Sequence, residues 1–295
     1  MWKPRRATGS EENQLAAGAS GAPPIPPMET LGRLGSLEVR LAADRREMRK
    51  AQRLRYKVFF EEGGAFPDAR TAFTRRDADR FDTFCDHMIV IDHAATTKKG
   101  KVRPRIVGTC RLLRGDRAVL AGGYYSAGEF DIAPLLDRHQ GKRILELGRS
   151  CVLSSYHGQR TLELLWRGLL AYIHAHRIDV MFGCASFPGG CPADHAEALS
   201  YLAHYASAPE MWRVRARREL YVPMAILPRE GMDEKKSHAA LAPLLKRYLR
   251  LGARFGEGAV VDGKFNTTDV FVIMPIAGNE RRYLEFLGRD VRRAA

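Results

Sequence analysis

Two apolar stretches, RIVGTCRLL at residues 105–113 and RILELGRSCV at residues 143–152, decide the fold class of this sequence. Apolar residues run through both over the length of a strand, and Leu145 and Leu147 alternate with Glu146 in the second. A third such run, HMIVID at residues 87–92, comes before them. We therefore expect three consecutive strands, which, ahead of a helix–strand unit, favour a mixed sheet over a doubly wound one.

Hydrophobic periodicity and capping residues predict further elements on both sides of these strands. Asp44 can cap a helix that runs to residue 62, where Gly63 and Gly64 would end it. The sequence thus predicts an α/β (α+β) protein with a mixed, mostly antiparallel central sheet flanked by helices. Other helices are expected at residues 160–176, 193–206 and 238–251, and other strands at residues 37–41, 178–186, 219–227 and 270–276.

Composition divides the 295 residues into three parts. Residues 1–36 are rich in Gly, Ala, Ser and Pro, and we expect them to form a disordered tail. Residues 37–227 hold most of the predicted strands and form the core. Residues 228–295 are interpreted as a C-terminal extension packed on that core.

Apolar and cysteine content bear on the location of the protein. No uncharged run reaches the ~18 residues that a membrane-spanning helix needs, and the first residues lack the apolar segment of a signal peptide. The five cysteines are scattered, which is typical of reduced thiols in a cytosolic protein, and no C-x-x-C pair indicates zinc. We therefore expect a cytoplasmic protein with no metal site.

The chain carries 48 Lys and Arg against 34 Asp and Glu, a formal charge of +14, and the charges of residues 1–38 cancel. The surplus favours an acidic partner, such as nucleic acid, an anionic membrane face or an acidic protein. No zinc-finger spacing, basic-zipper heptad or RNA-binding aromatic motif accompanies it, so no specific nucleic acid is expected. Basic residues gather in three clusters: Arg213, Arg215, Arg217 and Arg218; Lys246, Arg247, Arg250 and Arg254; and Arg281, Arg282, Arg289, Arg292 and Arg293.

Charged residues inside the predicted strands are the strongest sign of a functional site. Arg111 lies in one apolar strand, and Glu146 and Arg149 lie three apart in the next. Asp79 and Asp82 stand just before another strand. An ionised side chain in such a position is costly unless it is paired or reaches a cleft. A carboxylate in a cleft can act as a general base, and arginines can hold a substrate carboxylate.

The loop LSSYHGQR at residues 153–160 joins a predicted strand to a predicted helix. Backbone N–H groups at a helix N-terminus bind phosphate well, and Gly158 would permit a close approach. An ordinary strand–helix loop is the alternative interpretation. No nucleophile elbow, P-loop or H-E-x-x-H motif is present, and Cys184 and Cys191 are interpreted as structural.

Four ordered motifs resemble a known family: RYKVFFEE at residues 55–62, DRFD at 79–82, VGTCRLL at 107–113 and ELGRSCV at 146–152. They resemble the signature of acyl-homoserine-lactone synthases, and still more closely that of the related L-ornithine Nα-acyltransferases of bacterial ornithine-lipid synthesis. The segment at residues 244–276, from LLKRYLRLG to VFVIMPI, is similar to the second group alone. The resemblance covers roughly residues 37–288.

The resemblance implies a GNAT-type fold and an N-acyltransferase. Such an enzyme transfers a (3-hydroxy)acyl group from acyl carrier protein to the α-amine of L-ornithine, forming lyso-ornithine lipid. No cofactor would be bound, because the phosphopantetheine thioester of acyl carrier protein is the co-substrate. The implied partners are acyl carrier protein and L-ornithine. The basic C-terminus adds a separate hypothesis, a peripheral contact with an anionic inner membrane, to which a simple docked helix is the favoured alternative.

The resemblance and the chemistry of amide formation together assign roles to residues. Glu146 is the expected general base, with no covalent acyl-enzyme. The predicted catalytic residues are Glu146, Arg149 and Arg111. The predicted substrate-binding residues are Arg55, Phe59, Asp79 and Asp82. The predicted phosphopantetheine-binding residues are Cys151, Val152, Leu153, Gly158, Gln159 and Arg160.

Two alternatives remain open at this point. One is an enzyme like the acyl-homoserine-lactone synthases, or another long-chain N-acyl amino acid synthase. The other is a GNAT-like nucleic-acid-binding or regulatory module without catalysis, against which Glu146 in its strand argues.

Overall fold

The computed structural model describes residues 30–276 of the chain. Most of the predicted N-terminal tail, residues 1–29, lies outside the described residues, and so do the basic positions between residues 281 and 293. The predicted core and most of the predicted extension lie inside them.

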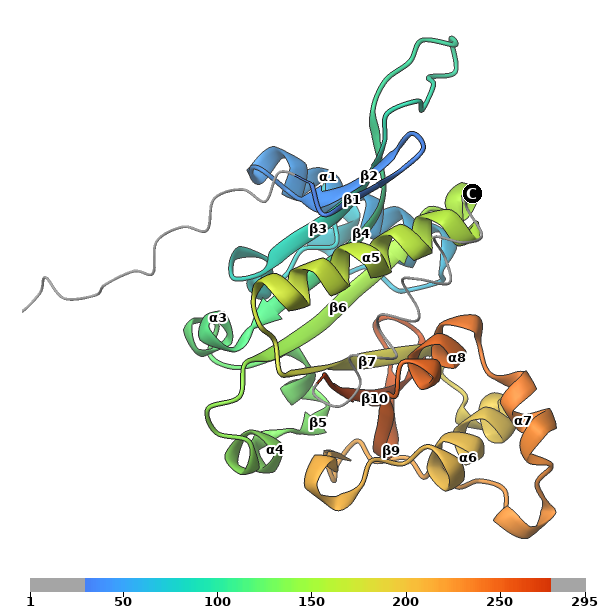
Figure 1. Cartoon of the computed structure of the whole chain (residues 1–295). Helices are drawn as coiled ribbons and strands as arrows, with labels where there is room; N and C mark the ends of the chain where they lie inside the picture. The colour runs from blue at the N-terminus through green and yellow to red at the C-terminus, as the bar shows by residue number, and fades with distance from the viewer. Residues whose placement is uncertain (1–29, 277–295) are drawn as a thin grey trace, which may run out of the picture.

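A ten-stranded sheet runs through the described residues in the order β1-β2-β3-β4-β6-β7-β10-β9-β8-β5 (Figure 1). Neighbouring strands are antiparallel except where β6 meets β7 and β8 meets β9. The predicted mixed, mostly antiparallel sheet is therefore confirmed. The strands are β1 (Gly32–Leu34), β2 (Leu37–Leu41), β3 (Asp86–Asp92), β4 (Arg105–Arg114), β5 (Phe130–Asp131), β6 (Ile144–Val152), β7 (Val180–Pro188), β8 (Arg215–Ala216), β9 (Arg254–Asp262) and β10 (Thr267–Pro275).

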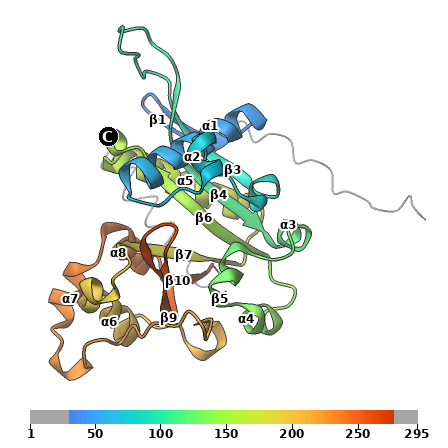
Figure 2. The same cartoon turned by 180° about the vertical axis from the view of Figure 1, so that it is seen from behind.

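Helices cover both faces of the N-terminal half of the sheet. α5 lies over one face of β2, β3 and β4, and α1 crosses the opposite face, as Figures 1 and 2 show from the two sides. Within the described chain, no helix combines the length and the apolar composition needed to cross a membrane. The helices are α1 (Arg45–Tyr56), α2 (Ala69–Thr74), α3 (Gly115–Leu120), α4 (Ala133–Arg138), α5 (Gln159–Ala175), α6 (Ala196–Tyr205), α7 (Glu234–Ala240) and α8 (Pro243–Arg250).

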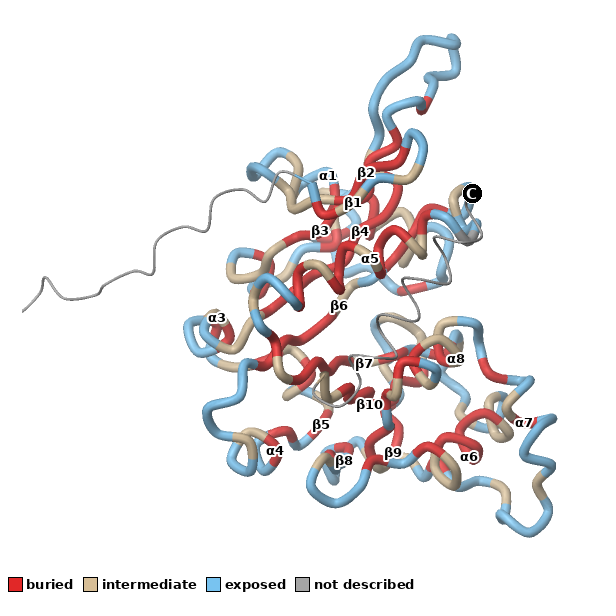
Figure 3. Tube along the Cα trace, viewed as in Figure 1, coloured by how far each residue is buried: buried red, intermediate tan, exposed pale blue. Residues whose placement is uncertain are grey.

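Strand β3 shows why the sequence is apolar without interruption there. Met88 and Val90 belong to the core cluster that contains the buried face of α5, whereas Ile89 and Ile91 pack with Ala51 of α1. Successive side chains of a strand point to opposite faces, so a strand covered on both faces needs apolar residues at every position. Figure 3 shows this burial along the central strands, while the turn between β3 and β4 is exposed.

The first helix begins and ends as its sequence predicts. Asp44 caps α1 by accepting a hydrogen bond from the Glu47 N–H at 2.7 Å. The helix then continues as a π-helical turn over Lys57–Glu62 and ends at Gly63. Turns of this kind are frequent at functional sites, and this one carries Val58 and Phe59 to the central sheet.

The predicted tail extends too far along the chain. Residues 32–34 form β1, which pairs with β2 through a tight turn at Gly35, where φ is +61°. Leu31 is buried in the core, and Thr30 Oγ1 donates to Glu38 Oε1 at 2.7 Å. The glycine that looked like tail composition is the turn residue of a hairpin.

Two elements of the C-terminal half differ from their predictions. The strand expected at residues 219–227 is wrong, because only Val222 in that stretch forms a β-bridge, to Ala259. The helix expected at residues 238–251 is two helices that break at residues 241–242. Pro243 begins the second, and the residue before a proline disfavours helical backbone.

Residues 254–275 complete the sheet instead of packing onto a finished core. β10 pairs with β7 at nine positions, from Thr267 with Pro188 to Pro275 with Val180. β9, which the sequence did not predict, lies on the other side of β10. The region interpreted as an extension therefore supplies interior strands, and the core cannot close without it.

Candidate active site

β6 and β7 are the parallel pair at the centre of the sheet, and they separate along their length (Figures 1 and 2). Their pairing is confined to residues 144–146 of β6 and 180–182 of β7. Beyond these pairs a cleft of about 360 Å³ opens between residues 147–150 and residues 184–188. Its other walls comprise Val58, Phe59, Gly63, Arg111, Leu113, Tyr125, Ser126, Glu146, Leu244, Tyr248, Asp262, Phe265, Thr267 and Asp269.

Gly183 lies where the two strands begin to separate. A Cβ atom at this position would stand 2.3 Å from the backbone oxygen of Leu147. Real atoms do not approach so closely, so glycine is required for the contact between β6 and β7 at the base of the cleft.

We expect Gly183→Ala to lower both stability and activity. The added methyl group must push the backbones of β6 and β7 apart, and overpacking of this kind costs about 1–3 kcal/mol. Thermal unfolding and kcat/KM measure the two effects. Gly231→Ala is the matched control, because a Cβ atom there meets nothing within 4 Å. An unchanged melting temperature for Gly183→Ala would show that the strands are not held at this distance.

β6 contains a bulge beside the cleft. Its register with β4 shifts between Thr109 and Arg111, so that Arg149 and Ser150 together oppose Cys110. Arg149 has a φ of +51°, a left-handed conformation that residues other than glycine rarely adopt. Such a conformation persists only where the surroundings hold it.

The side chain of Arg149 shows what holds the bulge. Its guanidinium lies 3.1 Å from Asp77 Oδ2 and 3.6 Å from Asp79 Oδ2. The same group stacks over the rings of Tyr125, at 4.5 Å, and Phe265, at 4.4 Å. These partners come from three separate segments of the chain, so Arg149 connects these segments beside the cleft.

A buried ion-pair network joins α1 to β4 next to the cleft. Arg55 Nη2 donates to both carboxylate oxygens of Asp82 at 2.9 Å, and Arg55 Nε lies 2.9 Å from Asp77 Oδ2. Arg111 Nη1 lies 2.7 Å from Asp79 Oδ1 and 3.3 Å from Asp82 Oδ1. Arg55, Asp77, Asp82 and Arg111 are only 1–3% exposed. Charges at this depth need partners, which explains why they occur together.

Asp82 is held ionised by this network. Burial opposes its ionisation, but Arg55 and Arg111 outweigh burial, and the pKa of Asp82 lies below its ordinary value. Burial also lowers the pKa of His87, whose Nε2 contacts the backbone oxygen of Asp82 at 2.9 Å. Asp82 is therefore a poor proton acceptor near neutral pH.

Glu146 has a different environment. Its Oε1 accepts hydrogen bonds from the Ser126 N–H at 2.7 Å and the Ser126 hydroxyl at 2.5 Å, and its Oε2 accepts one from the Tyr125 N–H at 2.8 Å. Burial raises the pKa of Glu146, although these hydrogen bonds act in the opposite direction. Because Oε2 accepts one hydrogen bond from residues 30–276, it keeps a lone pair there for another proton.

The structure brings most of the predicted catalytic and substrate-binding residues together. Glu146, Arg149, Arg111 and Phe59 all line the cleft. The predicted pairing of the two arginines with aspartates is present, whereas neither forms an ion pair with Glu146 among residues 30–276.

Three of the predicted substrate-binding residues stand behind the wall of the cleft. Arg55, Asp79 and Asp82 do not line it. Asp79 pairs with Arg111 and Arg149, Asp82 pairs with Arg111, and Arg55 pairs with Asp82. Their geometry suits residues that position other side chains.

The residues predicted to bind phosphopantetheine follow the cleft-lining part of β6 along the chain. Cys151, Val152 and Leu153 are buried in the core at and after the end of β6. Gly158 caps α5, which begins at Gln159, and Arg160 in its first turn is exposed. The core packing of the first three leaves only their backbone groups for a ligand.

Sequence reasoning missed several residues of the site. Asp77 carried a signal, because it stands two positions before Asp79, but Tyr125, Ser126 and Phe265 carried none. The sequence also did not predict that Glu129, Asp262 and Asp269 come together, with carboxylate oxygens within 4.8 Å of one another. Among the described residues, these are the ones that could hold a cation.

Comparisons with known proteins find a matching family model and similar relatives. Residues 54–167 match the family model described as acetyltransferase (GNAT) domain. The L-ornithine N(alpha)-acyltransferase of Rhizobium meliloti is 50% identical over 91% of this chain and 90% of its own length. The protein of the same name from Brucella abortus is 49% identical over 89% of this chain and 92% of its own length.

A solved structure of an N-acyl amino acid synthase from uncultured soil microbes is also similar. The TM-score is 0.46 and the sequence identity 12%, over 83% of this chain and 94% of that one.

Proposed function

The chain belongs to the L-ornithine N(alpha)-acyltransferases, and from this premise we propose that it transfers a (3-hydroxy)acyl group from a carrier-protein thioester to the α-amine of L-ornithine, forming lyso-ornithine lipid. That it is an N-acyltransferase with a GNAT domain follows from its family. The observation that carries the choice of acceptor is the identity of 50% over nine tenths of the chain.

The reaction joins the amine nitrogen to the thioester carbonyl carbon and breaks the carbon–sulfur bond. A proton leaves the amine, and the thiol departs as the second product. An amine must be neutral to attack, so the site needs a proton acceptor and donors for the tetrahedral oxyanion.

Glu146 is the proposed proton acceptor. It lines the cleft, its pKa is raised by burial, and its Oε2 keeps an open lone pair. Residues 147–150 of β6 have no partner on β7, and they line the cleft as well. Backbone N–H groups of this bulged segment are the proposed donors to the oxyanion.

Arg149 is the better placed of the two arginines to hold the substrate carboxylate. Arg111 is engaged by Asp79 and Asp82 and is 3% exposed. Arg149 also pairs with aspartates, but its guanidinium lies between two aromatic rings on the cleft wall. A guanidinium has five donors and can bind a carboxylate with those that remain.

The proposal is tested with purified protein, long-chain acyl carrier protein and candidate acceptors. Mass spectrometry should find N-acylornithine with L-ornithine and no lactone with S-adenosylmethionine. Acyl-homoserine lactone as the product would contradict the proposal in favour of the first alternative. Absence of any acylated product, together with a gel shift on random DNA at physiological salt, would favour the second.

The ion pairs of the two described basic clusters support one of them over the other as the proposed docking site for an acidic carrier protein. In the first, Arg213, Arg215 and Arg217 pair with Glu210, Glu257 and Glu219 at 2.6–2.8 Å. In the second, α8 places Leu244 and Tyr248 in the cleft wall and also carries Lys246 and Arg250. Within residues 30–276, neither of these two basic residues has an acidic partner within 4 Å. We therefore propose α8 as the docking helix.

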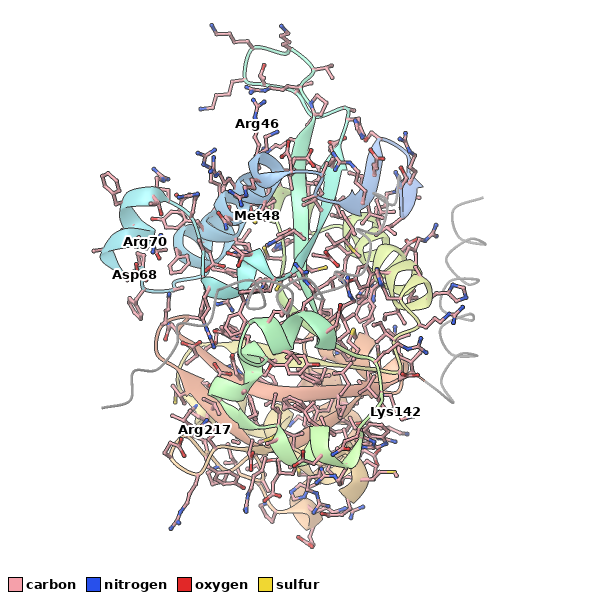
Figure 4. The ribbon with its side chains drawn as sticks, turned by 90° about the vertical axis from the view of Figure 1, so that its left-hand side faces the viewer. Arg46, Met48, Asp68, Arg70, Lys142 and Arg217 are labelled. Atoms are coloured by element: carbon pink, nitrogen blue, oxygen red, sulfur yellow. The ribbon has the colours of Figure 1, made fainter. Side chains whose placement is uncertain are left out.

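We expect Lys246→Glu with Arg250→Glu to raise KM for acyl carrier protein roughly 10-fold and to leave kcat nearly unchanged, because steering acts on association. The rise should shrink with added salt. Lys142→Glu and Arg217→Glu are controls at the surface, where Figure 4 labels both residues. The carrier thioester should also be a better donor than the matching acyl-CoA. Equal use of both donors, or no salt dependence, would contradict the docking proposal and show that these charges only form part of the solvated surface.

A further inference from the structure

Three acidic side chains, two of which line the cleft, come together beside it, and they are called the acidic triad below. Glu129 follows the turn that carries Tyr125 and Ser126, Asp262 ends β9, and Asp269 lies on β10. Each contributes an oxygen to a group within 4.8 Å. Asp262 and Asp269 line the cleft directly, and Glu129 accepts a hydrogen bond from the thiol of Cys184, another lining residue, at 3.5 Å.

No basic side chain within residues 30–276 forms an ion pair with the acidic triad, although the charge of Arg149 lowers the pKa of Glu129 and of Asp269 against the larger effect of burial. Arg149 is already engaged by Asp77 and Asp79. The repulsion is visible in Glu129, where burial and then the charges of Asp269 and Asp262 raise the pKa to about 7. The site therefore favours a positive group that is not part of the described chain.

Asp269 is the member of the triad that has a buried oxygen without a hydrogen-bond partner in the described residues. Its side chain is 7% exposed and lines the cleft, and its Oδ1 accepts no hydrogen bond of good geometry within residues 30–276. The hydroxyl groups of Thr267 and Ser186 lie close enough to lower the pKa of Asp269, but the burial that raises this pKa outweighs them. Buried carboxylate oxygens are almost always hydrogen-bonded, so this acceptor points to a donor supplied by a ligand. Asp262 differs, because its Oδ1 accepts the N–H groups of Lys264 and Phe265 in the β9–β10 turn.

We propose that the acidic triad binds the side-chain ammonium of the acceptor amino acid and thereby selects a diamino acid over neutral ones. The inference rests on the proposed function for the identity of the acceptor. A primary ammonium has three N–H donors and matches three carboxylate acceptors. A calcium ion needs six to eight oxygen ligands, so water or bidentate carboxylates would have to complete its shell, and the test below includes the metal ion alone.

With the triad, the cleft contains groups suited to each part of the two substrates. Val58, Phe59 and Leu244 form an apolar wall that suits an acyl chain, and Arg149, Glu146 and two of the three acids line the same cleft. A diamino acid would then place its carboxylate near Arg149, its α-amine near Glu146 and its side-chain ammonium at Asp269. The terminal amine is held by charge and so kept away from the thioester.

The test compares L-ornithine with L-norvaline, which has the same carbon chain but no terminal amine. Wild-type protein should prefer ornithine by at least about 100-fold in kcat/KM, because a site built for a polar group rejects analogues that lack it. Asp269→Asn should lower kcat/KM for ornithine about 10–100-fold, mainly through KM, and change that for norvaline less than about 3-fold. Glu129→Gln should act in the same direction.

Asp137→Asn is the matched control, because this aspartate of α4 is exposed and does not line the cleft. Equal use of norvaline and ornithine by wild-type protein would overturn the inference while the acylation of ornithine stood. An unchanged ornithine-to-norvaline ratio in both Asp269→Asn and Glu129→Gln would also overturn it. If no acceptor is acylated, the proposed function is contradicted. The binding of L-ornithine in the absence of acyl donor then tests whether the triad is an ammonium site.

Binding is measured by thermal shift, without acyl donor, with L-ornithine in EDTA and separately with Mg²⁺ or Ca²⁺ alone. Stabilisation of wild-type protein by ornithine, reduced in Asp269→Asn, supports the ammonium site. Stabilisation by the metal ion alone, again reduced in Asp269→Asn, would make the triad a cation site of another kind and overturn the inference. Stabilisation by neither ligand would overturn it as well.

Discussion

Glu146→Gln should reduce kcat roughly 10²–10⁴-fold, the usual loss when a general base is removed. The glutamine keeps the shape of the side chain but cannot take up the ammonium proton. The expected pH dependence has a definite sign. A base acts in its deprotonated form, so activity rises as pH increases through the pKa of Glu146, which burial raises. Glu146→Gln should remove that ascending limb from the pH profile of kcat.

The hydrogen bonds of Glu146 require a control, because the residue also anchors the segment of Tyr125 and Ser126. Ser126→Ala removes the 2.5 Å hydroxyl contact and leaves the carboxylate in place. If Glu146 is the base, Ser126→Ala should lose far less activity and keep the ascending limb. Similar losses in both variants, with an unaltered pH profile, would show that Glu146 only positions the segment.

Arg55→Ala should cost about 3–5 kcal/mol of unfolding free energy, the usual penalty for breaking a buried ion pair. Arg55 is 1% exposed and engages Asp77 and Asp82, so its removal leaves two buried carboxylates without their main partner. Because folded domains are stable by only about 5–15 kcal/mol, much of the stability would be lost. The melting temperature should fall by about 6–20 °C.

Arg53→Ala on the same helix is the matched control, since Arg53 is exposed. It should unfold within about 0.5 kcal/mol of wild type. Activity of Arg55→Ala, measured well below its melting temperature, should also drop, because Asp77 and Asp82 hold Arg149 and Arg111. A fully stable and active Arg55→Ala would show that the network is not needed to build the cleft.

Strands β3, β4 and β6 were predictable because their signal is local. An apolar run of strand length indicates a strand that is buried on both faces, whichever elements pack against it. β9 was missed for a reason that the structure supplies. A Cβ atom on Gly256 would stand 2.7 Å from the backbone oxygen of Val214, and Gly258 has a φ of +82° against the ring of Tyr221. Glycines needed for close packing weaken the strand pattern in the sequence.

The candidate site also contains residues that could be predicted from the sequence and contacts that could not. Arg111, Glu146 and Arg149 could be identified from the sequence, because an ionised residue inside an apolar strand is costly and so signals a partner or a cleft. Which partner each one takes could not be read from the sequence. Asp77 and Asp79 lie about seventy residues from Arg149 along the chain, and only packing brings them within 3.1 and 3.6 Å of it.

The sequence by itself determined many of the helices and strands, the family resemblance and the charged residues of the central strands. The tertiary structure alone decided where β6 leaves β7, how Arg149 is held at the bulge, and that Asp269 of β10 meets Glu129 and Asp262. The physical reason is the range of the interactions. Periodicity and capping act within a few residues, whereas strand pairing and ion pairing depend on which distant segments the closing of the core brings together.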